Sequence, residues 1–232
     1  RGLGDVYKRQ VVSLGSPRLE FLVKVMLHRY PMTLPQGTTT LLIFTQKLKA
    51  YVKRDNEDPM VRVIKSCARA IKAQGGGANL LLKLHPSETV FDAQRYVNSA
   101  SSEGLSIEHI RVLSGTLSPI EALSRSDIVV AAFSTTILDS MLLGKPTVAA
   151  PFVMSDQSLP LYEWMNELRG GLLVAKDEID LEEKLAKLLS LNDYRAWQAR
   201  LAKQTSWSFL NIDGAILRVV RLVKQYLSKR AT

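Results

Sequence analysis

The sequence has little of what several classes of protein require. Among its 232 residues there is one cysteine, Cys67, which excludes a framework of disulfides. Cys67 lies in a helical pattern, so we predict a small core residue rather than a reactive thiol. Three isolated histidines and this cysteine make no metal-binding pattern, so we expect no metal ion. No stretch approaches the roughly 18 uncharged apolar residues of a membrane-spanning helix.

The sequence also lacks the common phosphate-binding and nucleophile motifs. No G-x-x-x-x-G-K-[ST] pattern occurs, and no G-x-G-x-x-G follows a predicted strand. ATPases and dinucleotide-dependent enzymes are therefore disfavoured, and we expect no bound cofactor. The absence of G-x-S-x-G argues against a hydrolase.

Acidic residues are fewer than basic residues, which gives a net charge of +9 and a pI near 9.7. Such a balance suggests nucleic acid, but the basic residues do not cluster with aromatic ones and no nucleic-acid motif is present, so we predict no such partner. The basic end of the chain is the exception: a predicted helix over 214–230 carries Arg218, Arg221, Lys224, Lys229 and Arg230. A solvated face is one interpretation; peripheral contact of a cytoplasmic protein with the inner membrane is the other.

The first ten residues, RGLGDVYKRQ, do not fit the rest of the chain. Asp5–Gln10 resembles the in-frame translation of a sequencing adaptor, and residues 1–10 fit neither a signal peptide nor a structural element. We therefore expect the chain to be a fragment whose natural sequence extends upstream of Val11.

Short apolar runs alternate with helical patterns over most of the chain. The runs lie at 41–44, 79–84, 110–113, 127–132, 147–150 and 171–174, and the helical patterns between and after them at 59–74, 89–101, 119–125 and 181–191. Strands that are continuously apolar are typical of a parallel sheet covered on both faces. We predict an α/β, Rossmann-like domain over 41–192. Residues 11–40 are expected to be the end of an N-terminal domain and an interdomain linker, with a short strand at 11–14 and a helix at 19–30. Two helices, at 193–203 and 214–230, are expected to follow.

Polar residues stand directly after four of the predicted strands. They are Thr45-Gln46, His85-Pro86-Ser87-Glu88, Ser114-Gly115-Thr116 and Ser134-Thr135-Thr136. Because the carboxyl ends of parallel strands meet at one edge of a sheet, these loops are expected to line a single crevice suited to a phosphorylated ligand.

The candidate side chains in these loops have structural interpretations as well. His85 can donate to a phosphate oxygen, act as an acid near neutral pH, or simply bond its own loop. The hydroxyls of Ser134, Thr135 and Thr136 can cap a helix, cradle a phosphate, or do both. Asp139 can accept from ribose hydroxyls or compensate the helix dipole. We assign His28 and His109 to structure.

Several short motifs together resemble a known family. They are Gly15-Ser16-Pro17-Arg18, Lys83-Leu84-His85-Pro86, Ser134–Asp139, Leu143-Gly144-Lys145-Pro146 and Asp213-Gly214. In order and spacing they resemble the C-terminal, nucleotide-binding half of GT-B-fold bacterial surface and capsule polysaccharide glycosyltransferases. Relatives of these enzymes include UDP-N-acetylglucosamine 2-epimerases and CDP-glycerol and sialic-acid transferases. The resemblance covers roughly residues 11 to 225.

The resemblance implies a UDP-, CMP- or CDP-linked sugar donor and a saccharide or lipid-linked acceptor. It implies that His85, Ser134, Thr135 and Thr136 hold the donor phosphates and that Asp139 takes the ribose. The base would contact backbone groups of Ser114, Gly115, Thr116, Leu117 and Ser118. Gln46, Ser16 and Arg18 would lie at the cleft toward an N-terminal domain, across which the last helix packs. That domain would carry the catalytic base, so the fragment alone is expected to be inactive.

The sequence is compatible with three functions. The donor-binding half of a glycosyltransferase is favoured, because hydrogen-bond donors around a leaving pyrophosphate stabilise the developing charge without a metal. A 2-epimerase is disfavoured, since the Gly-Gly and paired-Glu pattern that we would expect after Ser134 is missing. A non-catalytic nucleotide-binding module of a polysaccharide export complex is the third.

Overall fold

The computed structural model describes residues 16–21, 24, 37–48, 57–113, 116–154, 172–190, 194, 196 and 214–228. The chain divides into two compact units. One comprises residues 30–204 and contains the sheet; the other combines residues 1–29 with residues 205–232. Each unit is described by itself.

The larger unit is built on a sheet of six parallel strands in the order β3-β2-β1-β4-β5-β6. The strands are β1 (Thr40–Phe44), β2 (Asn79–Lys83), β3 (Ile110–Leu113), β4 (Ile128–Ala131), β5 (Thr147–Ala149) and β6 (Leu173–Val174). Leu41, Leu42 and Ile43 are fully buried, as are all four residues of β4. Burial on both faces accounts for the unbroken apolar runs, and the predicted parallel sheet is confirmed.

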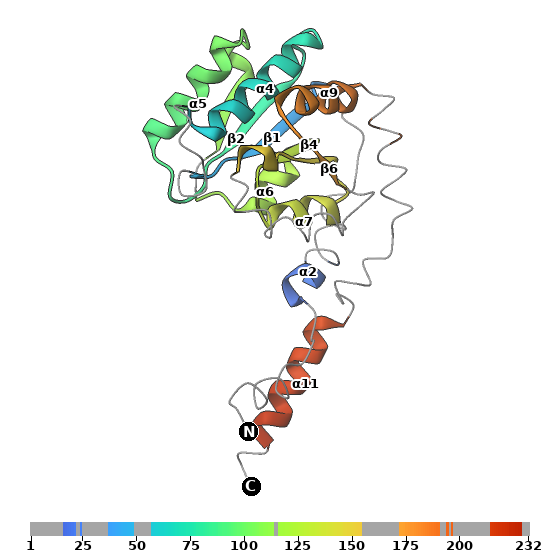
Figure 1. Cartoon of the computed structure of the whole chain (residues 1–232). Coiled ribbons are helices and arrows are strands. Elements are labelled where there is room, and N and C mark those ends of the chain that lie inside the picture. The colour runs from blue at the N-terminus through green and yellow to red at the C-terminus, as the bar shows by residue number, and fades with distance from the viewer. Residues whose placement is uncertain are drawn as a thin grey trace, which may run out of the picture. The chain divides into compact units, whose positions relative to one another are not determined.

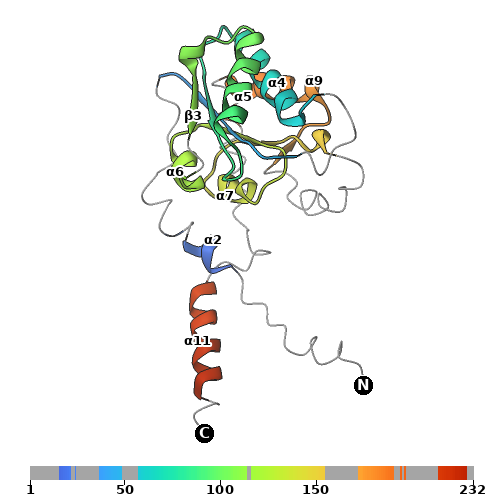
Figure 2. The ribbon, with the colours of Figure 1, turned by 90° about the vertical axis from the view of Figure 1, so that its left-hand side faces the viewer.

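Helices cover both faces of the sheet (Figures 1 and 2). On one face α4, α5 and α9 lie together, and on the other lie α6 and α7. Their bounds are α4 (Pro59–Ala73), α5 (Val90–Ser102), α6 (Pro119–Ser124), α7 (Thr136–Leu142) and α9 (Glu178–Leu189), with single 3-10 turns at η3 (Ile107–His109) and η4 (Pro151–Val153). The predicted Rossmann-like architecture is therefore confirmed.

Local sequence signals fix where these helices start. Asp58 accepts a hydrogen bond from the Met60 N–H at 2.9 Å at the start of α4, and Pro59 occupies the first turn. Capping boxes start α5 (Thr89 with Asp92) and α6 (Ser118 with Glu121). Such caps satisfy N–H groups that have no partner within the helix.

The strand order contains one reversal, which matters for function. From β1 the chain moves outward through β2 to β3, then returns to the other side of β1 to form β4, β5 and β6. In open α/β sheets, ligands bind in the crevice at the carboxyl ends of the strands where the order reverses. Here that point lies between β1 and β4.

The smaller unit joins two segments far apart in the sequence, α2 (Pro17–Phe21) and α11 (Ala215–Ser228). Of the predicted helix over 19–30, residues 19–21 lie in α2, and residues 22, 23 and 25–30 lie outside the described residues. The last helix, predicted over 214–230, is seen as Ala215–Ser228, and residues 229 and 230 lie outside the described residues. The predicted strand at 11–14 and most of the helix at 193–203 lie outside the described residues. None of the helices in the described ranges is long and apolar enough to cross a membrane.

Candidate functional site

Three of the predicted loops lie side by side at the carboxyl edge of the sheet. Phe44 at the end of β1 pairs with Lys83 of β2 on one side and with Ala131 of β4 on the other. Gln46, His85 and Phe133 each stand two residues beyond these paired positions. The loops after β1 and β4 therefore flank the reversal point, and the loop after β2 adjoins it. In the loop after β3, Ser114 and Gly115 lie outside the described residues.

His85 is exposed, and its ring is held from one side by its own turn. The Ser87 N–H donates to Nδ1 at 3.2 Å, and the Ser87 hydroxyl lies 2.8 Å from the same atom. A ring nitrogen that accepts an N–H carries no proton in the neutral imidazole, so the proton sits on Nε2. The structural interpretation of His85 is thus correct for Nδ1, while Nε2 is the donor that a ligand can use.

The turn that carries His85 is tied to its surroundings by Glu88. The Glu88 N–H donates to the His85 carbonyl at 2.9 Å, and the His85 N–H donates to Glu88 Oε2 at 2.7 Å. Oε2 also accepts from the Thr45 hydroxyl in the loop after β1, and Oε1 accepts from the Tyr96 hydroxyl on α5 at 2.6 Å. One carboxylate thereby joins two loops of the edge to a helix behind them.

Two buried groups adjust the electrostatics behind this edge. Burial lowers the pKa of Lys83, while the nearby Glu88 carboxylate opposes that shift. Burial raises the pKa of Tyr96, and its hydrogen bond to Glu88 raises it further, so Tyr96 remains a neutral donor. The negative charge of Glu88 is compensated locally by Lys83 and by its donors.

Gln46 is half-buried in the loop after β1, next to the reversal point. Its Nε2 atom is buried and has no hydrogen-bond partner among the described residues. A buried amide donor without a partner costs on the order of 1–3 kcal/mol unless a ligand or water satisfies it.

The three hydroxyl residues after β4, Ser134, Thr135 and Thr136, have different surroundings. The Ser134 Oγ accepts from the Thr136 N–H at 3.2 Å and from the Thr136 hydroxyl at 2.8 Å, so Ser134 orders the start of α7. Thr136 is buried, and Thr135 is exposed without a side-chain capping bond. The capping interpretation is therefore supported for Ser134, and Thr135 is the exposed hydroxyl of the three.

The remaining candidates have varied surroundings. Asp139 has no exposed surface, so a ribose contact there would require its side chain to become exposed, and its predicted role stays a prediction. Thr116 is exposed and Leu117 is half-buried, whereas the Ser118 N–H and hydroxyl both bond Glu121 in the capping box of α6. Ser118 thus contributes helix geometry, and its N–H is already used.

The candidates Ser16 and Arg18 belong to the smaller unit. Ser16 Oγ accepts from the Leu19 N–H at 3.3 Å at the start of α2, and Arg18 is exposed. Within the described ranges, no group of three or more His, Cys, Asp or Glu side chains is arranged to hold a metal ion.

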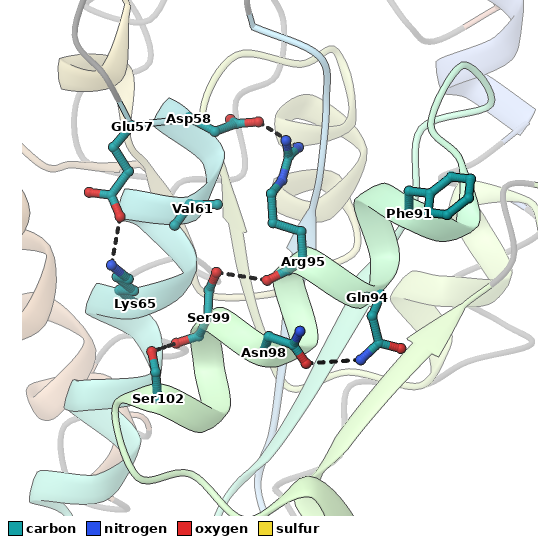
Figure 3. Close-up of a pocket in the computed structure, with 10 residues that line it drawn as sticks. All are labelled: Glu57, Asp58, Val61, Lys65, Phe91, Gln94, Arg95, Asn98, Ser99 and Ser102. Atoms are coloured by element: carbon teal, nitrogen blue, oxygen red, sulfur yellow. Dashed lines mark hydrogen bonds and ion pairs between the residues drawn. The ribbon is translucent and has the colours of Figure 1, made fainter.

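A cavity of about 690 Å³ lies between α4 and α5, away from the predicted residues (Figure 3). Its polar side chains largely bond one another: Lys65 with Glu57 at 2.6 Å, Arg95 with Asp58 at 2.6 Å, and Gln94 with Asn98 at 2.9 Å. Arg95 Nε is buried and has no hydrogen-bond partner among the described residues. Because the other polar groups satisfy one another and none of the residues indicated by the sequence lines the cavity, it is a weaker candidate than the sheet edge.

Sequence reasoning missed the roles of Lys83, Glu88 and Tyr96. The only available signal for Glu88 was its place at the end of the His85-Pro86-Ser87-Glu88 turn. Nothing local indicates that its carboxylate reaches Thr45, which lies 43 residues earlier.

The fold is similar to that of several proteins of known structure. The UDP-GlcNAc 2-epimerase of Neisseria meningitidis, solved with UDP-GlcNAc, has a TM-score of 0.59 at 12% identity, covering 95% of this chain and 58% of that one. The S. aureus MnaA–UDP co-structure has a TM-score of 0.61 at 15% identity, covering 96% and 56%. The wall teichoic acid polymerase TagF, solved with CDPG, has a TM-score of 0.52 at 14% identity, covering 97% and 52%.

The chain thus spans about half the length of these structures. At these identities the likeness establishes a shared fold, the Rossmann-like half of GT-B glycosyltransferases and UDP-GlcNAc 2-epimerases. No family model and no curated protein matches the sequence at a significant level.

Proposed function

We propose that the edge formed by the loops after β1, β2 and β4 binds the nucleotide of a nucleotide-sugar donor. The observation that carries the proposal is the side-by-side placement of Gln46, His85 and Ser134–Thr136 at the reversal point. Proteins of this fold have been solved with UDP-GlcNAc, UDP and CDPG.

In this proposal each group of the edge has a defined contact with the nucleotide sugar or supports a residue that does. His85 Nε2–H and the Thr135 hydroxyl donate to phosphate oxygens. Gln46 Nε2, which has no partner among the described residues, donates to the ligand across the reversal point. Ser134 and Thr136 hold the loop, and residues 114–118 line the base. Donors fixed before binding stabilise a leaving nucleotide at no reorganisation cost, which is the chemistry that glycosyl transfer needs. We therefore propose a glycosyltransferase of surface polysaccharide synthesis as the parent activity.

The test is calorimetric titration of the chain with UDP, CDP and CMP. We expect dissociation constants in the millimolar range for at least one nucleotide, and about tenfold weaker binding for His85→Ala. The matched control is His109→Ala, because His109 Nδ1 lies 3.1 Å from Asn79 Oδ1 at the opposite end of β2. Equal binding by the two variants, or no binding by the unaltered chain at millimolar nucleotide, would contradict the proposal.

A 2-epimerase is the second candidate, and one observation favours it. Two UDP-GlcNAc 2-epimerase structures have TM-scores of 0.59 and 0.58, against 0.50 to 0.52 for an O-GlcNAc transferase, the wall teichoic acid polymerase and a trehalose-phosphate synthase. In the same titration a preference for a cytidine nucleotide excludes the epimerase, whereas a preference for UDP fits both candidates.

We also propose that α11 touches an anionic membrane surface. The helix carries Arg218, Arg221 and Lys224 and no acidic residue, and Leu217 and Val223 are about half exposed. Cationic and apolar side chains on one helix fit a lipid interface. Co-sedimentation with vesicles containing phosphatidylglycerol, but not with purely zwitterionic vesicles, is the expected result.

A further inference from the structure

We propose that Glu88 is a positioning residue of the nucleotide site: its carboxylate fixes the His85 turn against Thr45 and Tyr96, and so presents His85 Nε2 to a nucleotide phosphate. The ligand in this statement rests on the proposed function. The positioning itself rests on contacts within the chain.

The Glu88 carboxylate is already fully engaged by hydrogen-bond donors of the chain itself. Oε2 accepts from the His85 N–H at 2.7 Å and from the Thr45 hydroxyl, and Oε1 accepts from the Tyr96 hydroxyl at 2.6 Å. An acceptor-only group that receives donors on both oxygens has little left for a ligand. A carboxylate that faced an anionic phosphate directly would also repel it. Glu88 therefore acts through its neighbours.

The side chains that bond Glu88 are held rigidly. Tyr96 is fully buried and Thr45 is 3% exposed, so neither side chain moves without disturbing the core. The Thr45 N–H also donates to the Lys83 carbonyl at 3.0 Å, and the Thr45 hydroxyl oxygen lies 3.1 Å from the same carbonyl oxygen. Glu88 thus anchors an exposed turn to a fixed wall and sets the distance between the loops after β1 and β2.

The orientation of the His85 imidazole depends on the same turn. The Ser87 N–H holds Nδ1 only while the turn from His85 to Glu88 keeps its shape. That shape is closed by the Glu88 N–H on the His85 carbonyl and by the Glu88 carboxylate on the His85 N–H. Removing the carboxylate removes one of these two closures and the link to Thr45, which frees the ring to change tautomer and direction.

The decisive experiment is a double-mutant cycle with His85. UDP, or whichever of UDP, CDP and CMP binds most tightly, is titrated against the unaltered chain, Glu88→Gln, His85→Ala and the double variant. We expect about tenfold weaker binding for Glu88→Gln, and a double variant within about twofold of His85→Ala alone, because Glu88 acts through His85. Additive losses, or unchanged binding by Glu88→Gln, would overturn the inference.

A second measurement needs no nucleotide and so separates this inference from the proposed function. The chain has three histidines, which makes their imidazole ¹⁵N resonances easy to assign. In the unaltered chain His85 is expected to be the Nε2–H tautomer, and in Glu88→Gln its two nitrogen shifts should move toward a tautomeric average, with His109 unchanged. If no nucleotide binds but the His85 shifts respond, the proposed function fails and Glu88 keeps its positioning role; if they do not respond, the positioning role fails.

Two further variants test whether an effect of Glu88→Gln comes from the lost contacts rather than from loss of folding. Glu183→Gln makes the same chemical change at an exposed position of α9 and should alter neither readout. Tyr96→Phe removes the bond to Oε1 and the hydroxyl's interaction with Arg95 but leaves both Oε2 bonds, so it should shift binding and the His85 resonances in the same direction as Glu88→Gln but by less. Should Glu88→Gln not fold, Tyr96→Phe and Thr45→Val carry the same two measurements, and no effect from either would overturn the inference.

Discussion

The carboxylate of Glu20 accepts a hydrogen bond from the backbone N–H of Ile216, 196 residues later in the sequence, at 2.7 Å. Its other oxygen accepts from the Gly214 N–H at 3.0 Å. Free N–H groups at a helix N-terminus favour a negative charge, so α2 supplies the N-terminal cap of α11. This relationship explains why two ends of the chain form one unit.

Glu20 makes this unit sensitive to acid. Its hydrogen bond to Lys24, and then those from Ile216 and Gly214, lower its pKa from the ordinary 4.5 to about 2. A lowered folded-state pKa stabilises the folded form above pH 4.5, and this stabilisation is lost as the pH falls toward 2. We expect Glu20→Gln to release α11 at neutral pH, seen as lower amide exchange protection at residues 216–220. The substitution should also flatten the pH dependence of this protection between pH 4.5 and about 2. A pH profile unchanged by the substitution would show that another carboxylate holds α11.

Gly75 and Gly77 offer a matched test of backbone strain after α4. Gly75 has a φ of +85°, Gly77 has no positive φ, and a Cβ at either meets nothing within 4 Å. Gly75→Ala should therefore lower the free energy of unfolding by about 1 kcal/mol, because an L-residue is strained there. Gly77→Ala should be neutral or stabilising by up to about 1 kcal/mol. Urea unfolding followed by circular dichroism measures both free-energy changes. Equal changes for the two substitutions would show that the loss of stability does not come from the positive φ of Gly75.

Cys67 should report unfolding of the larger unit. It is fully buried in α4, and burial raises the pKa of its thiol, so little thiolate forms near neutral pH. We expect alkylation with iodoacetamide to be at least about a thousandfold slower than in the urea-unfolded chain, because the thiol reacts only after opening. As the only cysteine, it makes the readout specific. Fast labelling of the folded chain would mean that α4 opens independently of the sheet.

Much of the fold could be predicted because its signals are local. The strand at 110–113 and the helices from Pro59 and Pro119 start where predicted, since caps, prolines and apolar runs act within a few residues. The last strand was predicted over 171–174 and is seen as Leu173–Val174. That edge strand pairs with β5 alone, so its extent depends on one neighbour rather than on its own sequence.

The candidate site could be predicted in part. Polar residues after strands indicated Gln46, His85 and Ser134–Thr136, and parallel strands brought their loops to one edge. The pattern could not show that Asp139 is buried or that the Ser118 N–H is taken by Glu121, because both follow from how α6 and α7 pack. It also gave no sign of Glu88, whose partners lie on two other elements.

By itself, the sequence determined a parallel α/β domain with hydroxyl, amide and imidazole groups after its strands, since side-chain periodicity and helix caps are short-range properties. Only the tertiary structure decided that β1 lies between β2 and β4, and therefore that the loops of Gln46, His85 and Ser134 are neighbours. It alone joined Glu88 to Thr45 and Glu20 to Ile216. Strand order and contacts across dozens of residues come from burying whole faces against one another, and that packing is a property of the assembled chain.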